Sequence, residues 1–457
     1  MKPLTAAEIA VLSGALLVRG PAATVLTAVT TDSRAVPESS LFVALRGQNF
    51  DGHDFLAPAV AAGAGAVLVE RPEAVPASAV AVLAAPDAVA ALQRLAAGYR
   101  KLLAPRVVAV TGSNGKTTCK DFTSAVLSVR HSVQATAGNL NNHLGLPLTM
   151  LAHEPGQTHG VYELGSNHPG EIAALAALAR PDIAVVTSVG TAHIEFFGSV
   201  EAIADEKASL FAALRPEGVA VLNLESPWAE RCRTKAPGRV VEVGIGRGTV
   251  RAEEVTFNEA GLAWFTIRAE GASARVVMPV PGAHMIQNAL LALAVGWIEG
   301  VPLEEGASAL AAAGLSQGRL QRRQWRGVSI WDDSYNGNPD SMTAAIEALA
   351  AAAADGRRIA VLGGMAELGK FEAEGHRRVG RAAAGAQLDL VCTVGPDGAP
   401  IAAAAEAGGV AVRTFETHRE CAAWLAGELR PGDLVLLKGS RRAAMEKVLS
   451  CLEEVSA

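Results

Sequence analysis

Long apolar runs and aromatic side chains are scarce in this sequence. Phe, Trp and Tyr make up 4% of the 457 residues, and much of the 50% apolar content is alanine. No stretch of about 18 or more apolar residues occurs, which argues against a membrane span. Residues 1–20 carry Lys2, Glu8 and Arg19 between short apolar stretches and lack the segments of a secretory signal. We therefore expect a cytoplasmic protein.

Cysteine and positive charge are also sparse. The five cysteines are odd in number and scattered, and no Cys-x-x-Cys pair suggests zinc, so we expect reduced thiols. The formal net charge of −6 provides no basic excess for neutralising a nucleic-acid backbone. A small anionic substrate remains compatible with this charge, because a local site needs only a few cations.

The length and the order of elements predict an α/β fold with three domains. A chain of 457 residues exceeds the size of one core, which stops growing at about 250 to 300 residues. We expect an N-terminal α/β domain over 1–86, a central domain over 87–316 and a Rossmann-like C-terminal domain over 317–457. A helical pattern over 86–104 leads into the central domain, and the alanine-rich stretch 344–354 is typical of a helix.

Short β-branched runs separated by helix-length segments predict parallel sheets covered on both faces. The central domain has such runs at 107–110, 161–164, 183–187 and 219–222. The C-terminal domain has a second series at 328–331, 359–362, 390–394 and 434–437.

The strongest motif follows the apolar run 107–110, where a glycine-rich turn leads into a helix. Two glycines let successive N–H groups point inward, and the helix adds its positive end, which suits phosphate. Lys116 can reach terminal phosphates and Thr117 can ligate Mg²⁺. Val110 stands where the standard loop has a further glycine, so an unrelated glycine-rich turn is the alternative. The predicted ATP contacts are Gly112, Ser113, Asn114, Gly115, Lys116, Thr117 and Thr118.

The spacing of Thr111, Gly112, Gly115, Lys116 and Thr117 resembles the phosphate loop of the Mur ligase family, which also includes folylpolyglutamate synthetase. Further segments extend the resemblance over nearly the whole chain. Residues 31–34, 41–47 and 50–55 look like the UDP-sugar-binding domain of family members that add the third residue or the final dipeptide. The resemblance implies substrate contacts by Ser33 and Arg34, whereas the residues alone also fit a turn.

Two central segments are similar to substrate and metal sites of the family. Segment 136–147 resembles the part that contacts the sugar-phosphate portion, through Asn139 and Asn142, although it also fits a polar loop. Glu163 ends a central strand, where a carboxylate is well placed to hold Mg²⁺, and the resemblance implies that role. It also implies a second magnesium contact at His193, although histidine is an unusual ligand for this ion.

Lys207 has two interpretations. As bare sequence it is a solvated helix lysine, because lysine is rarely buried. The resemblance instead implies a lysine carbamylated by CO₂, whose new carboxylate helps to position Mg²⁺. That chemistry needs a neutral amine, which burial favours by lowering the lysine pKa. The implied metal ligands are Thr117, Glu163, His193 and carbamylated Lys207.

The remaining nucleotide contacts are implied by later segments. Segment 281–290 looks like the adenine-side loop, with Asn288 matching and Met285 standing where an asparagine is usual. Arg319 matches a hinge arginine that contacts ATP, and an exposed loop arginine is the alternative. Asp333 ends a strand and is suited to a ribose hydroxyl.

Segment 332–342 bears on the choice among family members. Together with 363–369, His376 and 438–441 it is similar to members that add D-alanyl-D-alanine, with Tyr335, Asn336 and Asn338 lining the acceptor pocket. The Asp-Asn-Pro-Arg-type motif of the ligase for the third amino acid is missing.

The resemblance thus implies an ATP-dependent, ADP-forming ligase of peptidoglycan precursor synthesis. It would join D-alanyl-D-alanine to UDP-N-acetylmuramoyl-tripeptide through an acyl phosphate, as a monomer, with ATP and Mg²⁺. Lys116, Glu163, His193 and Lys207 are the implied catalytic residues. The alternatives are the ligase for the third amino acid, a folylpolyglutamate-type ligase, and a nucleotide-binding regulator without catalysis. The sequence does not decide whether the tripeptide ends in diaminopimelate or lysine.

Overall fold

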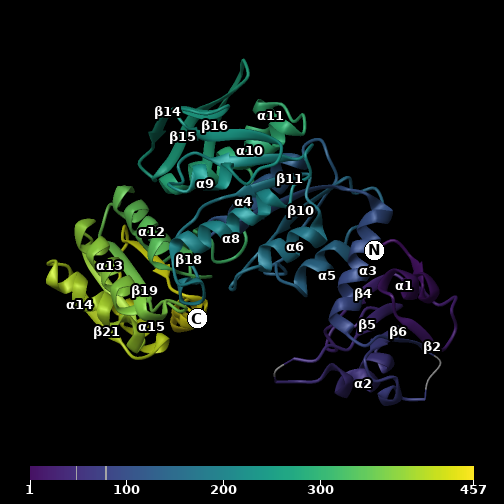
Figure 1. The fold of residues 1–457 in the computed structure, drawn as a ribbon. Helices are drawn as coiled ribbons and strands as arrows, with labels where there is room; N and C mark the ends of the chain where they lie inside the picture. Colours follow the sequence, from purple (N-terminus) through teal and green to yellow (C-terminus); the bar gives the residue numbers. More distant parts are fainter. Residues whose placement is uncertain (48, 78–79, 457) are drawn as a thin grey trace.

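Three large β-sheets, each flanked by helices, follow one another along the chain (Figure 1). The structure is a computed structural model and describes residues 1–47, 49–77 and 80–456. The central lobe lies between the N-terminal lobe, coloured purple, and the C-terminal lobe, coloured green to yellow. The mixed α/β architecture predicted from the sequence is confirmed.

The N-terminal lobe contains a five-stranded sheet in the order β2-β7-β6-β5-β4. Its strands are parallel except at the edge, where β2 (Leu16–Arg19) runs antiparallel to β7 (Ala81–Ala84). The remaining elements are α1 (Ala6–Ser13), α2 (Leu56–Ala61), β4 (Ala28–Thr30), β5 (Ser40–Val43), β6 (Ala64–Val69) and the short pair β1 (Leu4–Thr5) and β3 (Val25–Leu26).

Helix α3 (Ala88–Leu103) connects the first lobe to the second. It forms where the helical pattern predicted it, and it packs on both α1 and α5 (Gly145–Leu151). Leu92 and Leu95 are buried, whereas Leu102 is 52% exposed. Because one apolar cluster runs from the N-terminal sheet through α3 into the central lobe, the division at residue 86 stays a prediction.

The central sheet has nine strands in the order β16-β15-β14-β13-β12-β11-β8-β10-β9. Its parallel part confirms the four predicted runs and comprises β8 (Arg106–Thr111), β9 (Val133–Ala135), β10 (His159–Glu163), β11 (Ile183–Val186), β12 (Val219–Asn223), β13 (Arg239–Ile245) and β14 (Val250–Phe257). The antiparallel extension β15 (Leu262–Ala269) and β16 (Ala272–Pro281) was not predicted.

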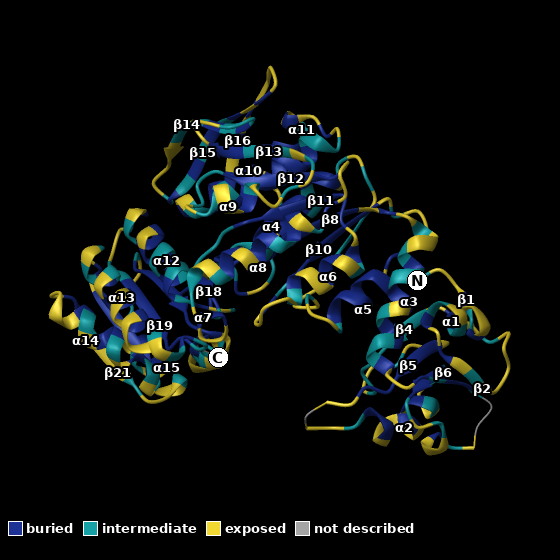
Figure 2. Cartoon of the chain, viewed as in Figure 1, coloured by how far each residue is buried: buried dark blue, intermediate teal, exposed yellow. Residues whose placement is uncertain are grey.

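Strand β8 distributes its side chains to two cores. Val108 and Val110 belong to one apolar cluster, and Val107 and Ala109 belong to the other. This alternation follows from the two-residue period of a strand. One face of the central sheet is covered by α4 (Lys116–Leu127), α10 (Ala283–Ile298) and α11 (Leu303–Ala311). The other face is covered by α5, α6 (Glu171–Ala179) and α8 (Val200–Ala212) (Figure 2).

The C-terminal lobe holds a six-stranded sheet in the order β17-β18-β22-β19-β20-β21, parallel except for β17 (Gln321–Trp325). The four predicted strands form, and a half-exposed β21 was not predicted. The predicted helix at 344–354 forms up to Ala351. The elements are α12 (Pro339–Ala351), α13 (Glu372–Gly385), α14 (Ala399–Ala407), α15 (His418–Glu428), α16 (Glu446–Ser456), β18 (Val328–Asp333), β19 (Arg358–Gly363), β20 (Leu390–Val394), β21 (Ala411–Phe415) and β22 (Leu434–Lys438).

Two expectations about the chain as a whole can be compared with the fold. No helix in the described ranges combines the length and apolarity needed to cross a membrane. All five cysteines are free thiols, as expected from their scattered positions.

We predict that Tyr99→Phe destabilises the protein by about 1–3 kcal/mol, because it leaves a buried carbonyl unpaired. The Tyr99 hydroxyl accepts from the Lys2 N–H at 2.5 Å and donates to the His153 carbonyl at 2.6 Å, which ties the start of the chain to the central lobe. Urea unfolding checks this effect. Tyr162→Phe is the matched control, because among the described residues its buried hydroxyl has a hydrogen bond only with the His153 ring, at 3.3 Å. Equal losses of unfolding free energy in the two variants would contradict a special stabilising role for the Tyr99 hydroxyl.

Candidate functional site

The glycine-rich turn after β8 requires its two glycines. Gly112 has φ +148° and Gly115 has φ +80°, both in the region that favours glycine. A Cβ at Gly112 would lie 2.1 Å from Thr187 Oγ1, and one at Gly115 would lie 2.4 Å from Asn288 Oδ1. Val110 is buried within β8, so its departure from the standard pattern lies in the strand and not in the turn.

The residues after β11 fix the turn from outside. Ser113 N–H donates to the Ser188 carbonyl at 2.9 Å, and Asn114 N–H donates to Ser188 Oγ at 2.9 Å. Thr187 Oγ1 donates to the Asn114 carbonyl at 2.5 Å. These bonds hold the loop in a preformed curl from which α4 starts at Lys116, with its N-terminal end directed at the loop.

Lys116 curls back over the loop. Its Nζ donates to the Gly112 carbonyl at 2.8 Å and to the Ser113 carbonyl at 3.3 Å. Burial lowers the pKa of Lys116, and the nearby Glu163 carboxylate opposes that shift. A cation on the turn provides the charge that a terminal phosphate would pair with.

Glu163 joins three segments at the carboxyl end of β10. Its carboxylate accepts from the Thr117 hydroxyl at 2.8 Å and from Asn141 Nδ2 at 2.8 Å, and only 3% of the residue is exposed. No group of three His, Cys, Asp or Glu side chains that could hold a metal occurs in the described ranges. The hydroxyl and carboxylate oxygens nevertheless fit Mg²⁺, which proteins hold with one or two carboxylates together with substrate phosphates and water.

Lys207 is buried, with 2% of the residue exposed, so the solvated alternative from the bare sequence is wrong. Its Nζ donates to Ser166 Oγ at 2.6 Å and lies 5.9 Å from the Phe197 ring centroid. No carboxylate pairs with it within the part of the chain that the structure describes, and the neighbouring Glu206 accepts from two backbone N–H groups instead. Burial, together with the charge of Lys116, lowers the pKa of Lys207 to about 7.

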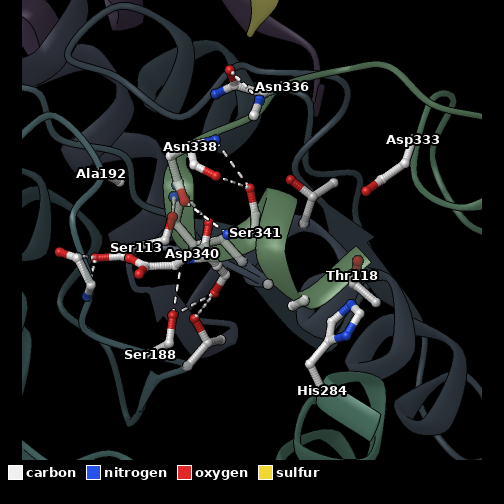
Figure 3. Close-up of a pocket in the computed structure, with 18 of the residues that line it drawn as sticks. Ser113, Thr118, Ser188, Ala192, His284, Asp333, Asn336, Asn338, Asp340 and Ser341 are labelled. Carbon is white, nitrogen blue, oxygen red and sulfur yellow. Dashed lines mark hydrogen bonds between the residues drawn. The ribbon is translucent and has the colours of Figure 1, made fainter. Parts of the chain in front are cut away.

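A cavity of about 710 Å³ separates the phosphate loop from the C-terminal lobe. Figure 3 shows Ser113 and Ser188 of the central lobe beside Asn338, Asp340 and Ser341 of the C-terminal lobe. The residues predicted to contact ATP that line it are Ser113 to Thr118, Asn288, Arg319 and Asp333, and His193, Asn336 and Asn338 also line it.

Three contacts between lobes close one side of this cavity. Asp340 accepts from the Thr191 N–H at 2.7 Å and from its hydroxyl at 2.8 Å. Asn338 Nδ2 donates to Asn114 Oδ1 at 2.8 Å. The His193 ring contacts the Glu367 carboxylate.

Arg319 and Asp333 lie on the C-terminal side of the cavity. Arg319 donates to Thr117 Oγ1 at 3.3 Å and stacks 4.2 Å from the Tyr335 ring centroid, while its buried Nε has no partner among the described residues. Asp333 accepts from Lys438 Nζ at 2.5 Å and from the Leu320 N–H at 3.3 Å. The arrangement places a guanidinium directly above the start of α4.

The side of the cavity predicted to contact adenine offers Asn288 only a weak acceptor, Met285. Asn288 Nδ2 lies 3.7 Å from the sulfur of Met285, the position where asparagine is usual in the family. His284 lines the same side, and burial lowers its pKa to about 4, so it is neutral at physiological pH. Asn288 is thus held by a weak acceptor and can turn its carbonyl oxygen elsewhere.

The predicted sugar-phosphate contacts lie outside this cavity. Ser33 and Arg34 belong to the N-terminal lobe, and the Arg34 side chain is 88% exposed beside Asp32 at 2.7 Å. Asn139 is exposed, and Asn142 accepts from the N–H groups of Leu144 and Gly145 at the start of α5. The structure brings none of these four side chains together with the phosphate loop, and their roles stay predictions.

The predicted acceptor residues are partly engaged with the protein itself. Tyr335 stacks under Arg319, and Asn336 Oδ1 accepts from the Arg441 N–H at 3.1 Å. Asn338 caps α12 in addition to its bond to Asn114. Their contact with a dipeptide stays a prediction.

Four residues of the site were missed by the sequence reasoning: Asn141, Ser166, Asp340 and Lys438. Ser166 belongs to the polar loop after the predicted strand 161–164, and Asn141 lies within segment 136–147, so both positions offered a signal. Asp340 and Lys438 act through partners more than 100 residues away in the sequence, Thr191 and Asp333, which spacing cannot reveal.

Comparison with known proteins matches the three lobes in order. Residues 25–104 match the Mur ligase family catalytic domain, residues 110–296 the Mur ligase middle domain, and residues 318–441 the Mur ligase glutamate ligase domain. The chain is similar to the UDP-N-acetylmuramoyl-tripeptide–D-alanyl-D-alanine ligases of Escherichia coli, with 38% identity, and Bacillus subtilis, with 36% identity. Each match covers 94% of both chains.

Solved structures agree with these matches. MurF from Acinetobacter baumannii superposes with a TM-score of 0.90 at 33% identity, covering 99% of each chain. MurF from Thermotoga maritima in complex with ADP gives a TM-score of 0.81 at 30% identity, covering 93% of this chain and 97% of that one. With all three domains matched in order and relatives of 36% and 38% identity matched over 94% of both chains, the chain belongs to the Mur ligase family.

Proposed function

We propose that this protein is an ATP-dependent, ADP-forming ligase that adds D-alanyl-D-alanine to UDP-N-acetylmuramoyl-tripeptide during peptidoglycan precursor synthesis, in the cytoplasm. The observation that carries the proposal is the junction of Lys116, Thr117 and Glu163 beneath a cavity shared by two lobes. This junction supplies a cation, a carboxylate that could hold Mg²⁺ and a preformed anion loop. It therefore suits transfer of a terminal phosphoryl group.

The choice of substrate is supported by the relatives. The ligases of Escherichia coli and Bacillus subtilis carry the name of the D-alanyl-D-alanine reaction, and both match almost end to end. The diaminopimelate ligase structure, at 19% identity and a TM-score of 0.55, supports only the shared fold. The higher sequence identity to the dipeptide-adding ligases therefore favours the dipeptide over a single amino acid as the acceptor substrate.

We propose that the three domains bind different ligands. Residues 1–86 would bind the UDP-sugar through Ser33 and Arg34, and residues 87–316 would bind ATP. Residues 317–457 would complete the ATP site and hold the dipeptide. The three lobes and the position of the cavity between the second and third support this assignment.

In the proposed reaction the terminal carboxylate of the tripeptide attacks the γ-phosphorus of ATP and ADP leaves, which forms an acyl phosphate. The amine of D-alanyl-D-alanine then attacks the acyl carbon, loses a proton and expels phosphate. Lys116 and Arg319 would offset the charge on the phosphoryl oxygens, and the closed cavity would exclude water. Mg²⁺ held by Thr117, Glu163 and His193 would neutralise phosphate charge when bound.

We further propose that Lys207 is carbamylated. A carbamate forms when a neutral amine attacks CO₂ and loses a proton, and burial holds the Lys207 pKa at about 7, so a large neutral fraction exists near physiological pH. The amine is buried without a carboxylate partner, and modification would replace an uncompensated cation by an anion beside Lys116. Ser166, at 2.6 Å, would hydrogen-bond the modified side chain.

We predict that phosphate is released from ATP only when UDP-N-acetylmuramoyl-tripeptide and D-alanyl-D-alanine are both present. A coupled phosphate assay measures this, with diaminopimelate, lysine or glutamate in place of the dipeptide as controls. Tripeptides ending in diaminopimelate and in lysine are compared in the same assay. Turnover with a single amino acid instead of the dipeptide would overturn the substrate assignment, and absence of turnover with every acceptor would overturn the proposed activity.

We predict that Lys207→Ala lowers kcat by at least about 10²-fold, because it removes the charge that stabilises phosphoryl transfer. Added acetate or formate should restore part of that activity by supplying the missing carboxylate. Lys116→Ala is the matched control: it should also be inactive, but a carboxylate should not rescue it because the lost group is a cation. Full activity in Lys207→Ala, or equal rescue of both variants, would contradict the carbamate.

A further inference from the structure

Glu367 contacts His193 across the boundary between the central and C-terminal lobes. Its carboxylate meets His193 Nδ1, and its carbonyl accepts from the Glu195 N–H at 3.2 Å. The two residues are separated by 174 positions in the sequence. Glu367 belongs to segment 363–369, to which the proposed reaction gives no role.

The backbone on both sides of this contact is unusual. His193 and Glu367 each have φ +60°, in the left-handed region that residues with a Cβ rarely adopt. Such conformations are energetically costly and cluster at functional sites. The two segments also pack tightly, since a Cβ at Gly369 would lie 3.0 Å from the Glu195 side chain. An incidental surface ion pair would not explain two strained residues that face each other.

Because an ionised carboxylate only accepts, this contact places the proton of a neutral His193 ring on Nδ1. When Nδ1–H donates to the carboxylate, the lone pair is left on Nε2. Nε2 has no hydrogen-bond partner within the described ranges, and His193 lines the nucleotide cavity. Metal-binding histidines commonly have their second nitrogen bonded to a carboxylate, which fixes the tautomer and the ring orientation.

We infer that Glu367 is a positioning residue that the C-terminal lobe contributes to the metal site of the central lobe, acting through His193. This inference rests on the proposed function, which makes His193 a metal contact. Docking of the C-terminal lobe would then prepare the metal site at the moment when the ATP cavity closes.

Mn²⁺ binding by the full chain, with a non-hydrolysable ATP analogue present, tests the inference without turnover. We expect Glu367→Ala to bind Mn²⁺ about 10-fold or more weakly than the unmodified protein. Glu367→Gln should lie between them, because the amide oxygen still accepts from Nδ1 but carries no charge. Glu372→Ala, which removes an exposed carboxylate at the start of α13, is the matched control and should bind as the unmodified protein does.

Two further measurements separate positioning from a general structural effect. In the His193→Ala background, Glu367→Ala should cause no additional loss of Mn²⁺ affinity. ¹⁵N NMR of labelled histidine should show the Nδ1-protonated tautomer for His193 in the unmodified protein and in Glu367→Gln, but not in Glu367→Ala. Unchanged Mn²⁺ affinity in Glu367→Ala, or an equal loss with and without His193, would overturn the inference.

These results do not depend on the identity of the substrates. If the dipeptide assay fails while Glu367→Ala still loses Mn²⁺ affinity through His193, the positioning role stands and the proposed reaction falls. If the protein turns over the dipeptide but Glu367→Ala leaves Mn²⁺ affinity unchanged, the proposed reaction stands and the positioning role of Glu367 falls.

Discussion

The site depends on the two hydrogen bonds that the buried Glu163 carboxylate accepts. The carboxylate accepts from Thr117 at the start of α4 and from Asn141 in the loop before α5, so it ties the phosphate loop to two neighbouring segments. A buried carboxylate needs such donors, because an unpaired one would be strongly destabilising. The parallel sheet makes the junction available, since β8, β10 and β11 all end at the same edge and each delivers its polar residues there.

Lys207 differs from Glu163 because its buried amine has no anionic partner among the described residues. An ammonium group buried without an anionic partner is costly, and the protein tolerates it by depressing its pKa. Two other buried lysines have an acidic partner, Lys120 with Asp121 at 2.6 Å and Lys438 with Asp333 at 2.5 Å, so the unpaired Lys207 needs a reason. The proposed carbamate would provide one, because it would turn the unfavourable cation into an anion that both Mg²⁺ and Lys116 would stabilise.

The sequence predicted those features that local pattern determines. The four predicted strands in each of the central and C-terminal sheets were found because both of their faces are buried and their apolar runs are continuous. The phosphate loop was found because its chemistry fits within a few residues. Strand β15, inside the central sheet, and the edge strand β21 were missed because half-exposed strands carry a weaker signal. The burial of Lys207 and the pairs Asp340–Thr191 and Glu367–His193 arise from packing between distant segments. Bare spacing contains no information about them, and only the family resemblance anticipated an unusual Lys207.

In the proposed function, the cavity between the central and C-terminal lobes would hold a nucleotide and a carboxylate together away from water. The most direct measurement of that claim follows the oxygen atoms. UDP-tripeptide labelled with ¹⁸O in its terminal carboxylate is converted with ATP and D-alanyl-D-alanine, and the released phosphate is examined by mass spectrometry. Transfer of one ¹⁸O into each phosphate, with ADP as the other product, is the result that carboxylate activation predicts. Unlabelled phosphate, or formation of AMP and pyrophosphate, would contradict it.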